Sequence, residues 1–378
     1  MVFPQKLSLH LTDRKNNNTL RLLPESNHLV DFSSNDYLGL AKCETVFNSS
    51  HQYLIENGYR YNGSTGSRLI SGNHDLYSII ESKIANIHQV QSALVFNSGY
   101  VANLGLLSCI AKKDDVVLFD KLSHASIRDG LQLAQAKSIA FAHNDLQKLE
   151  NKLIKYNKLR DNQEAEIYIV TESVFSMDGD SPDFISMTQL CDKYRARLIV
   201  DEAHGLGIYP NGLLQDLNLH HKVFARVMTF GKAMGCHGAA VLGSSKLIEY
   251  LVNFSRPFIY TTALSPHALA TIMCSYSALT PLLHSQLFEN IKAFKKQLRN
   301  LKLDDYFIDS DSAIQSCVIA NKLELKSVSN KLKTHNFHVK PIMYPTVPKG
   351  QERLRICIHS FNSFDEINKL LLILRESL

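Results

Sequence analysis

Short apolar runs alternate with longer amphipathic segments through the middle of the chain. The apolar runs are bounded by polar or small residues, which is typical of buried strands; they are ALVF, VVLF, SIAF, IYIV, RLIV and RVMT. The segments between them carry apolar residues at helical spacing, as in VANLGLLSCIAK and DFISMTQLCDKY. Strands that alternate with helices predict βαβ units, so we expect a mainly parallel sheet with helices on both faces.

The pattern changes after residue 265. A long helical segment runs through LHSQLFENIKAFKKQLRNLK, and the pattern then predicts strand, helix, strand, strand and helix. This order indicates a smaller C-terminal domain of the α+β class. We therefore expect an α/β protein with an N-terminal segment (1–40), a large domain (41–265) and a small domain (266–378).

The composition excludes several classes of function. The 378 residues include 41 Lys and Arg against 36 Asp and Glu, and the resulting charge of +5 is spread along the chain. So weak and dispersed a charge does not predict nucleic-acid binding. The seven cysteines lie far apart without a CxxC pair, which predicts reduced thiols, no metal site and a cytoplasmic protein. No segment has the apolar length of a signal peptide or membrane span, so we expect no membrane association.

Polar residues follow most of the predicted strands directly. In an open α/β sheet, ligands bind beyond the carboxyl ends of the strands, so residues at these positions are candidates for a site. In chain order they are Ser98, Gly99, Tyr100, His124, Glu172, Ser176, Asp201, His204, Thr229 and Lys232. The topology would bring all of them to one rim of the sheet.

Lys232 lies in MTFGKAMGCHGAA, where no acidic residue accompanies it. One explanation is a lysine whose apolar stem is buried while its ammonium reaches water. The alternative is a nucleophilic amine that forms a Schiff base with pyridoxal phosphate (PLP), a cofactor that acts as an electron sink. The companion residues favour this alternative, because Asp201 can hold the pyridine nitrogen of PLP protonated.

Other candidates also match parts of PLP. The helix that opens at residues 98–100 offers free amides and a positive dipole end to the phosphate, and the Thr229 hydroxyl can add a further bond. His204 could reach the phenolic oxygen, and the ring of His124 could stack on the pyridine. Each histidine alone could equally be a loop residue bonded to backbone, so the interpretation depends on the ordered set.

The run LIVDEAH permits a different interpretation, the magnesium-binding strand end of a nucleotide-hydrolysing helicase. That activity needs a phosphate loop of the form GxxxxGK[ST]. Here Gly231 and Lys232 are followed by Ala233, and no glycine lies five residues before Gly231. We therefore exclude this class.

Longer motifs follow one another along the whole chain. They are SSNDYLGL, NGSTGSRLISGN, NSGYVAN, SHASIRDG, TESVFSMDGDSP, DEAHGLG, TFGKAMGCHGAA, IYTTALSP and YPTVPKGQERLRI. Together they resemble the α-oxoamine synthases, PLP enzymes of the aspartate aminotransferase fold (fold type I). The resemblance implies a homodimer with its active sites between the subunits. It also implies a decarboxylative condensation of L-alanine with an acyl thioester of coenzyme A (CoA) or acyl carrier protein (ACP).

The resemblance also assigns roles by position. It implies that Lys232 carries PLP and later removes the α-proton of alanine. Around the PLP ring it places Asp201, His204, Ser176 and His124. Near the phosphate it places Ser98, Gly99, Tyr100 and Thr229, with Thr261 and Thr262 donating from the partner subunit. The substrate contacts that it implies are Arg21, Asn35, His124, Thr346 and Arg355.

One position departs from the family. Met343 stands where other members often have an arginine, which could pair with a carboxylate at the far end of the acyl chain. Either another cation, Arg21 or Lys340, binds such a carboxylate, or the pocket prefers an uncharged chain. We favour the first of these, because the remaining motifs match so closely.

Overall fold

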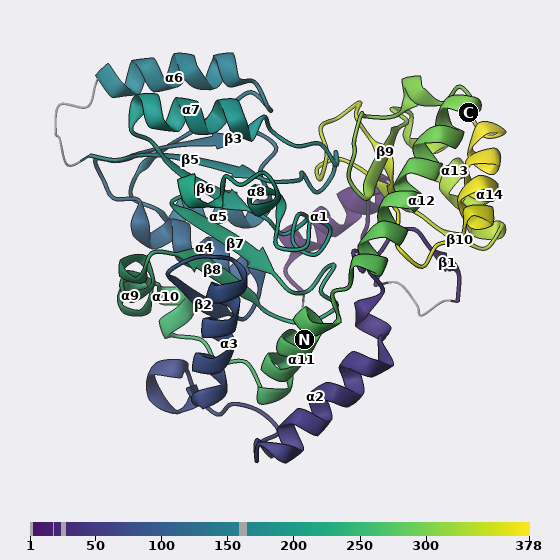
Figure 1. The fold of residues 1–378 in the computed structure, drawn as a ribbon. Helices are drawn as coiled ribbons and strands as arrows, with labels where there is room; N and C mark the ends of the chain where they lie inside the picture. The colour runs from purple at the N-terminus through teal and green to yellow at the C-terminus, as the bar shows by residue number, and fades with distance from the viewer. Residues whose placement is uncertain (1–2, 18, 24–27, 159–164) are drawn as a thin grey trace.

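The computed structural model describes residues 3–17, 19–23, 28–158 and 165–378. Its centre is a seven-stranded sheet in the order β2-β8-β7-β6-β5-β3-β4 (Figure 1). Neighbouring strands are parallel except β8, which is antiparallel to both β2 and β7. The strands are β2 (Ser92–Phe96), β3 (Val116–Asp120), β4 (Lys137–Phe141), β5 (Ile167–Glu172), β6 (Arg197–Asp201), β7 (Ala225–Thr229) and β8 (Ala239–Gly243). The expected mainly parallel sheet is confirmed, and β8 is a strand that the pattern analysis did not include.

Helices cover both faces of this sheet (Figure 1). The sheet is buried on both sides because successive strand residues alternate between two apolar clusters, as Val227 and Met228 do. One face is covered by α4 (Gly99–Ile110), α5 (Ala125–Leu133), α9 (Ser245–Phe254) and α10 (Arg256–Ile259). The other face is covered by α3 (Asp75–Ile87), α6 (Leu146–Lys158), α7 (Phe184–Tyr194), α8 (Leu213–Asp216) and α11 (Pro266–Ala278).

The C-terminal part of the chain forms a smaller antiparallel sheet in the order β11-β12-β9. Its strands are β9 (Ile314–Val318), β11 (Lys340–Ile342) and β12 (Arg353–Cys357), and its helices are α12 (Pro281–Asn300), α13 (Lys322–Thr334) and α14 (Phe364–Arg375). The three helices share one apolar cluster with β9 and β12. The strand and helix order predicted for this region is therefore observed, with the strand expected around residue 340 divided into β10 (Phe337–His338) and β11.

The segment near the N-terminus is joined to this C-terminal sheet. The short strand β1 (Val30–Asp31) pairs in parallel with β10. The backbone N–H of Cys357 donates to the carbonyl of Phe32 (2.8 Å), and that of Ser360 donates to the carbonyl of Tyr37 (2.8 Å). Residues 30–37 are consequently held beside β12.

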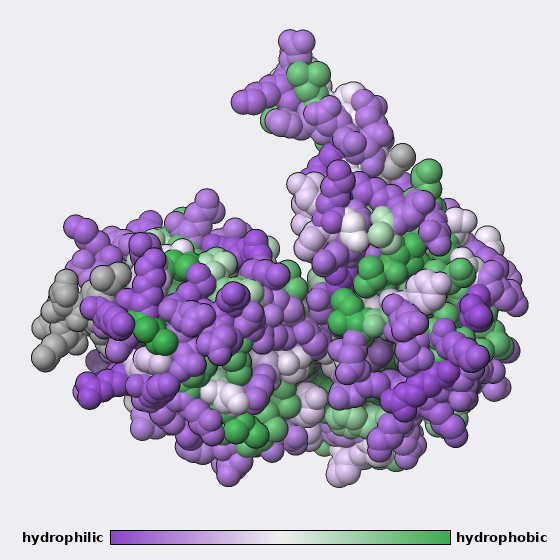
Figure 2. Space-filling view, turned by 90° about the horizontal axis from the view of Figure 1, so that it is seen from above, coloured by the Kyte–Doolittle hydropathy of each residue, from purple (hydrophilic) through white to green (hydrophobic). Residues whose placement is uncertain are grey.

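The N-terminal helix α1 (Gln5–Asn16) has no buried residue, whereas α2 (Glu44–Glu56) packs against α11. In the space-filling view a segment projects from one lobe, and the surface is hollowed between the two lobes (Figure 2). The apolar side chains of Phe3, Leu7, Leu9 and Leu11 are exposed. Among the described helices, none has the length and apolar character that a membrane span requires.

Candidate active site

Lys232 lies in the loop between β7 and β8, shortly after Thr229 ends its strand. Its Nζ atom is 2.7 Å from Nε2 of His204, which follows β6. Burial lowers the pKa of the Lys232 amine to about 8, although the carboxylates of Asp201 and Glu172 oppose this effect. An amine that is partly neutral near neutral pH is a nucleophile. The geometry therefore supports the Schiff-base chemistry expected of Lys232.

Asp201 ends β6 and is buried. Its Oδ2 accepts a hydrogen bond from Nδ2 of Asn103 (2.7 Å), and its Oδ1 accepts from the backbone N–H of Ala203 (2.9 Å). These bonds orient a carboxylate that could pair with a protonated pyridine nitrogen. Asn103 lies on α4 and also donates to Oγ of Ser126 (3.0 Å). The sequence analysis missed Asn103, although an amide on the buried face of an apolar helix was an available signal.

The start of α4 faces Thr229. Ser98 caps this helix, because its hydroxyl accepts a backbone N–H of the first turn (3.3 Å). Gly99 follows, and a Cβ added there would lie 3.3 Å from the side chain of Thr229. The glycine thus leaves the helix amides and the Thr229 hydroxyl accessible to an anion such as a phosphate. Tyr100 is exposed, and its hydroxyl donates to Asp129.

Glu172 holds the loop that presents His124. It is buried at the end of β5, and its Oε1 accepts the backbone N–H of His124 (2.6 Å). Burial, together with the nearby carboxylate of Asp201, raises the pKa of Glu172 to about 8. The side chain of His124 is exposed, and its Nδ1 accepts the backbone N–H of Ser126 (3.2 Å). The sequence analysis placed Glu172 at a strand end without giving it a role.

Arg355 on β12 connects the small sheet to the same region. Its Nε donates to the backbone carbonyl of Ser176 (2.6 Å), and its Nη2 donates to Oδ1 of Asn35 (2.9 Å). The same Nη2 is 3.2 Å from the hydroxyl of Tyr37, which in turn is 2.8 Å from Nδ1 of His204. Two of the predicted substrate contacts, Arg355 and Asn35, are thereby joined to His204. Tyr37 was missed, although the motif SSNDYLGL contains it.

The remaining predicted residues have no described contact with Lys232, Asp201 or His204. Nη2 of Arg21 is 3.4 Å from Oγ1 of Thr346, and both residues are exposed. The backbone carbonyl of Thr262 accepts a bond from Nδ2 of Asn97 (2.8 Å), which directly precedes the cap of α4. Thr261 and Thr262 thus lie near the start of α4 in their own subunit, and their contact to a partner subunit stays a prediction.

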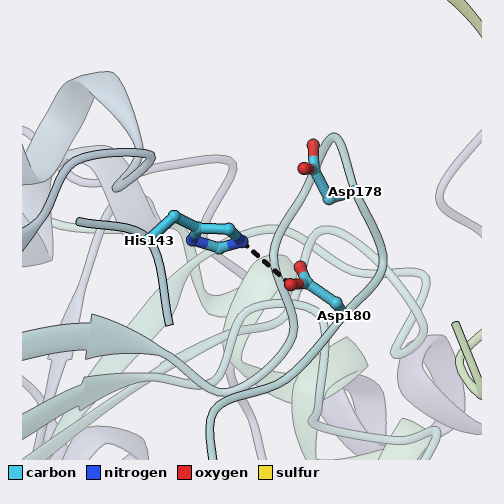
Figure 3. Close-up of side chains that lie close together, drawn as sticks. All are labelled: His143, Asp178 and Asp180. Carbon is cyan, nitrogen blue, oxygen red and sulfur yellow. Dashed lines mark hydrogen bonds and ion pairs between the residues drawn. The ribbon is translucent and has the colours of Figure 1, made fainter. Parts of the chain in front are cut away.

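A second polar cluster surrounds His143 (Figure 3). Its Nδ1 is 2.9 Å from Asp120 and its Nε2 is 2.8 Å from Asp180. Against the effect of burial, bonds to these two carboxylates raise the pKa of His143 to about 10. The donor atoms of His143, Asp178 and Asp180 lie within 4.8 Å of one another, but Asp178 forms an ion pair with Arg353. Because each group is already paired with an opposite charge, we interpret the cluster as an ion-pair network.

This network fixes the loop that follows β5. Oγ of Ser316 and Nη1 of Arg353 both donate to the backbone carbonyl of Met177 (2.5 and 3.3 Å). Arg355 holds the neighbouring carbonyl of Ser176. The loop is therefore bound to two strands of the small sheet at Ser176 and Met177.

The chain matches the aminotransferase class I and II family over residues 27–371. It belongs to this family. A Methylobacillus flagellatus protein named 8-amino-7-oxononanoate synthase is 34% identical over 93% of this chain and 87% of its own. A Methanococcus vannielii protein that bears this name provisionally is 37% identical over 98% of this chain and 100% of its own.

Solved structures of α-oxoamine synthases have the same fold as this chain. Serine palmitoyltransferase from Sphingomonas wittichii superposes with a TM-score of 0.88 at 25% identity, covering 100% of this chain and 98% of the other. The 8-amino-7-oxononanoate synthase of Francisella tularensis superposes with a TM-score of 0.77 at 28% identity, covering 93% and 98%. Both are α-oxoamine synthases, and this chain is likewise a PLP-dependent acyltransferase of fold type I.

The residues of this family member fit PLP. Lys232 supplies an amine of lowered pKa, and Asp201 supplies a buried, oriented carboxylate. Gly99 leaves open the space between the α4 amides and Thr229 that a larger side chain would fill. An amine, a carboxylate and an anion-binding helix start are the groups that a pyridoxal ring and its phosphate require.

Proposed function

We propose that the protein is an 8-amino-7-oxononanoate synthase. It would condense L-alanine with pimeloyl-CoA or pimeloyl-ACP and release CO2 together with CoA or ACP, giving 8-amino-7-oxononanoate. The observation that carries this proposal is a chain of hydrogen bonds of 2.7–3.2 Å, which runs through Tyr37 and joins Arg355 and Asn35 to the Lys232 and His204 pair. It supports a site for an amino-acid carboxylate next to the Lys232 amine. The names of the relatives supply the choice of substrate.

PLP, when bound, supplies an electron sink that stabilises negative charge at the α-carbon of an attached amino acid. Lys232 holds the cofactor and afterwards accepts the α-proton of alanine at Nζ. Asp201 keeps a proton on the pyridine nitrogen, and Ser176 and His204 bind at the phenolic oxygen. Arg355 and Asn35 bind the alanine carboxylate, for which the two N–H groups of a guanidinium are well suited.

His124 covers the cofactor ring and orients the substrate carboxylate in this proposal. Glu172 supports it by holding the backbone N–H of His124 at 2.6 Å. Ser98, Gly99, Tyr100 and Thr229 serve the phosphate end, where the helix amides and the Thr229 hydroxyl converge.

The residues expected to bind the acyl chain are compatible with a second function. Met343 offers no charge, whereas Arg21 is exposed and bonded to Thr346 in the same part of the chain. We propose that Arg21 or Lys340 binds the distal carboxylate of pimelate. The alternative is another α-oxoamine synthase, such as a long-chain aminoketone synthase or a 2-amino-3-ketobutyrate CoA ligase. The similarity to serine palmitoyltransferases favours keeping this alternative.

We further propose that the enzyme is a cytoplasmic homodimer. The exposed apolar side chains of α1 support a partner subunit, because an isolated helix with such a surface gains stability by covering it. The seven cysteines are all free, as a reducing compartment requires. In a dimer, Thr261 and Thr262 would donate to the phosphate bound by the other subunit.

The experiment that tests the function compares thioesters. Purified enzyme is assayed with L-alanine and either pimeloyl-CoA or octanoyl-CoA, and CoA release and ketone product are measured. We expect a ten- to hundredfold preference for pimeloyl-CoA, since a charge-assisted hydrogen bond contributes about 1.5–3 kcal/mol. A clear preference for octanoyl-CoA would contradict a pimeloyl thioester as the substrate and favour the alternative. Lys232→Ala serves as the inactive control.

A further inference from the structure

Tyr37 is completely buried, yet its hydroxyl lies among three polar groups. It is 2.8 Å from Nδ1 of His204, 3.1 Å from Oδ1 of Asn35 and 3.2 Å from Nη2 of Arg355. A phenol carries a single proton, so it can donate fully to one partner at a time. The direction of this hydrogen bond decides which nitrogen of His204 carries the ring proton.

The surroundings of the Tyr37 hydroxyl favour one direction. Arg355 has donors and no acceptor, so the Tyr37 oxygen accepts from it. Oδ1 of Asn35 already accepts from Arg355 at 2.9 Å. Nδ1 of His204 is closer to the hydroxyl than Asn35 is, and no other donor to it appears among the described contacts. The hydroxyl can donate to Oδ1 of Asn35 or to Nδ1 of His204, and the shorter distance favours Nδ1.

His204 then has its own proton on Nε2. Burial and the adjacent Lys232 amine hold the pKa of His204 well below its usual value, so the ring is neutral and carries one proton. With Nδ1 occupied as an acceptor, that proton lies on Nε2. Nε2 in turn faces Nζ of Lys232 at 2.7 Å.

We propose that Tyr37 is a positioning residue that holds His204 in its Nε2–H tautomer and thereby favours a neutral nitrogen on Lys232. An N–H donates well to a neutral amine, whereas it cannot accept a proton from an ammonium at the same position. The proposal rests on the proposed PLP-binding role of Lys232. Tyr37 itself has no described contact with Nζ of Lys232 or with the carboxylate of Asp201, so it would act through His204.

Other charged groups also act on Lys232, and they come from the elements packed around it. They are Asp201 on β6, Glu172 on β5, His124 at the start of α5 and Arg355 on β12. The substitution Tyr37→Phe removes one hydroxyl and leaves all four groups in the chain. A change in the protonation of Lys232 then comes from the lost hydroxyl, which contacts both His204 (2.8 Å) and Arg355 (3.2 Å), and the ring-nitrogen resonances of His204 distinguish these two contacts.

The test follows Schiff-base formation. The full chain is freed of PLP, PLP is added back, and the visible absorption band is recorded across a range of pH. Loss of one hydrogen bond changes an equilibrium by about three- to tenfold, so Tyr37→Phe should slow band formation by that factor near neutral pH. The midpoint of the pH profile should move upward by about 0.5–1, and the rates should converge in alkali.

A matched control is available in Tyr276. This tyrosine is also buried, and its hydroxyl is 2.8 Å from Nε2 of His88, away from the candidate site. Tyr276→Phe loses a buried tyrosine–histidine bond of the same length, and we expect it to keep the wild-type midpoint. An unchanged midpoint in Tyr37→Phe would overturn the proposal. A band in Lys232→Ala would instead contradict the proposed function, whatever Tyr37 does.

A measurement on the wild-type chain covers the case in which Tyr37→Phe does not fold. Nitrogen NMR of protein labelled at histidine distinguishes a protonated from an unprotonated ring nitrogen, and His204→Gln assigns the resonances. We expect an unprotonated Nδ1 and a protonated Nε2 on His204. The opposite tautomer would overturn the proposal.

Discussion

The ion pairs around His143 lead to a stability prediction that can be worked out from the structure. His143→Gln removes a cation that lies between Asp120 and Asp180, and Asp120 is completely buried. The rise in the pKa of His143 to about 10 from its usual 6.5 corresponds to roughly 4–5 kcal/mol of stabilisation. Breaking a buried ion pair by removing one partner costs about 3–5 kcal/mol, which agrees. We expect a loss of this size at neutral pH.

The sign of the pH dependence follows from the direction of this change in pKa. Because the pKa of His143 is higher in the folded state, its stabilisation is complete below about pH 6.5 and is lost as the pH rises through about 10. The difference between wild type and His143→Gln should be largest in mild acid and smallest in alkali. Scanning calorimetry at fixed protein and PLP concentrations measures it as a difference in melting temperature, roughly 2 °C per kcal/mol.

The exposed His335 provides the control, and His335→Gln should leave the melting temperature unchanged at every pH. A difference between wild type and His143→Gln that stays constant from mild acid to alkali would refute the reasoning. It would show that the loss comes from packing against Phe175, whose ring lies 4.4 Å from that of His143, and not from charge.

Three further substitutions test the site. Lys232→Ala should abolish the visible band of bound PLP, and borohydride reduction of the wild type should label Lys232 when peptides are mapped by mass spectrometry. Glu172→Gln keeps the oxygen that accepts the His124 N–H but no longer titrates. Because the pKa of Glu172 is raised to about 8, the stability of the wild type should fall as the pH rises from about 4.5 to 8. The stability of the variant should depend less on pH over that range. Arg355→Lys should raise KM for alanine about ten- to hundredfold with a smaller change in kcat, since a lysine cannot replace two parallel guanidinium bonds; steady-state kinetics at saturating acyl thioester would show this.

The parallel part of the fold could be predicted because its signal is local. Each strand from β3 to β7 is a short apolar run followed by polar residues, and the buried sheet needs no more information than that. The strand β8 was missed because AAVLG consists of small and apolar residues, and its place in the sheet depends partly on β2, which lies far away along the chain. The same argument applies to β1, whose two residues form a strand because β10 lies beside them.

The candidate site likewise contains residues that the sequence predicts and residues that it does not. Asp201 ends a strand, and His204 and Lys232 come within a few residues of strand ends, so strand order alone indicates that they converge. Asn103 lies within α4, and Tyr37 lies in a loop before α2. Neither residue follows a strand of the large sheet, so this rule could not find them. Their roles depend on which polar atom they meet across the fold, and side-chain distances of 2.7–2.8 Å are not encoded in local pattern.

The pairing of residues 30–37 with β10 and β12 bears on how the enzyme is made. During synthesis, domains fold in the order in which they leave the ribosome. Asp201, His204 and Lys232 emerge and can assemble while Tyr37 and its neighbours still wait for strands more than 300 residues later in the chain. If the proposed roles hold, a polypeptide that stops before β12 would carry the groups that bind the vitamin-derived cofactor but lack Arg355, the group proposed to bind the amino acid. It would then withdraw cofactor from the cell without turning over.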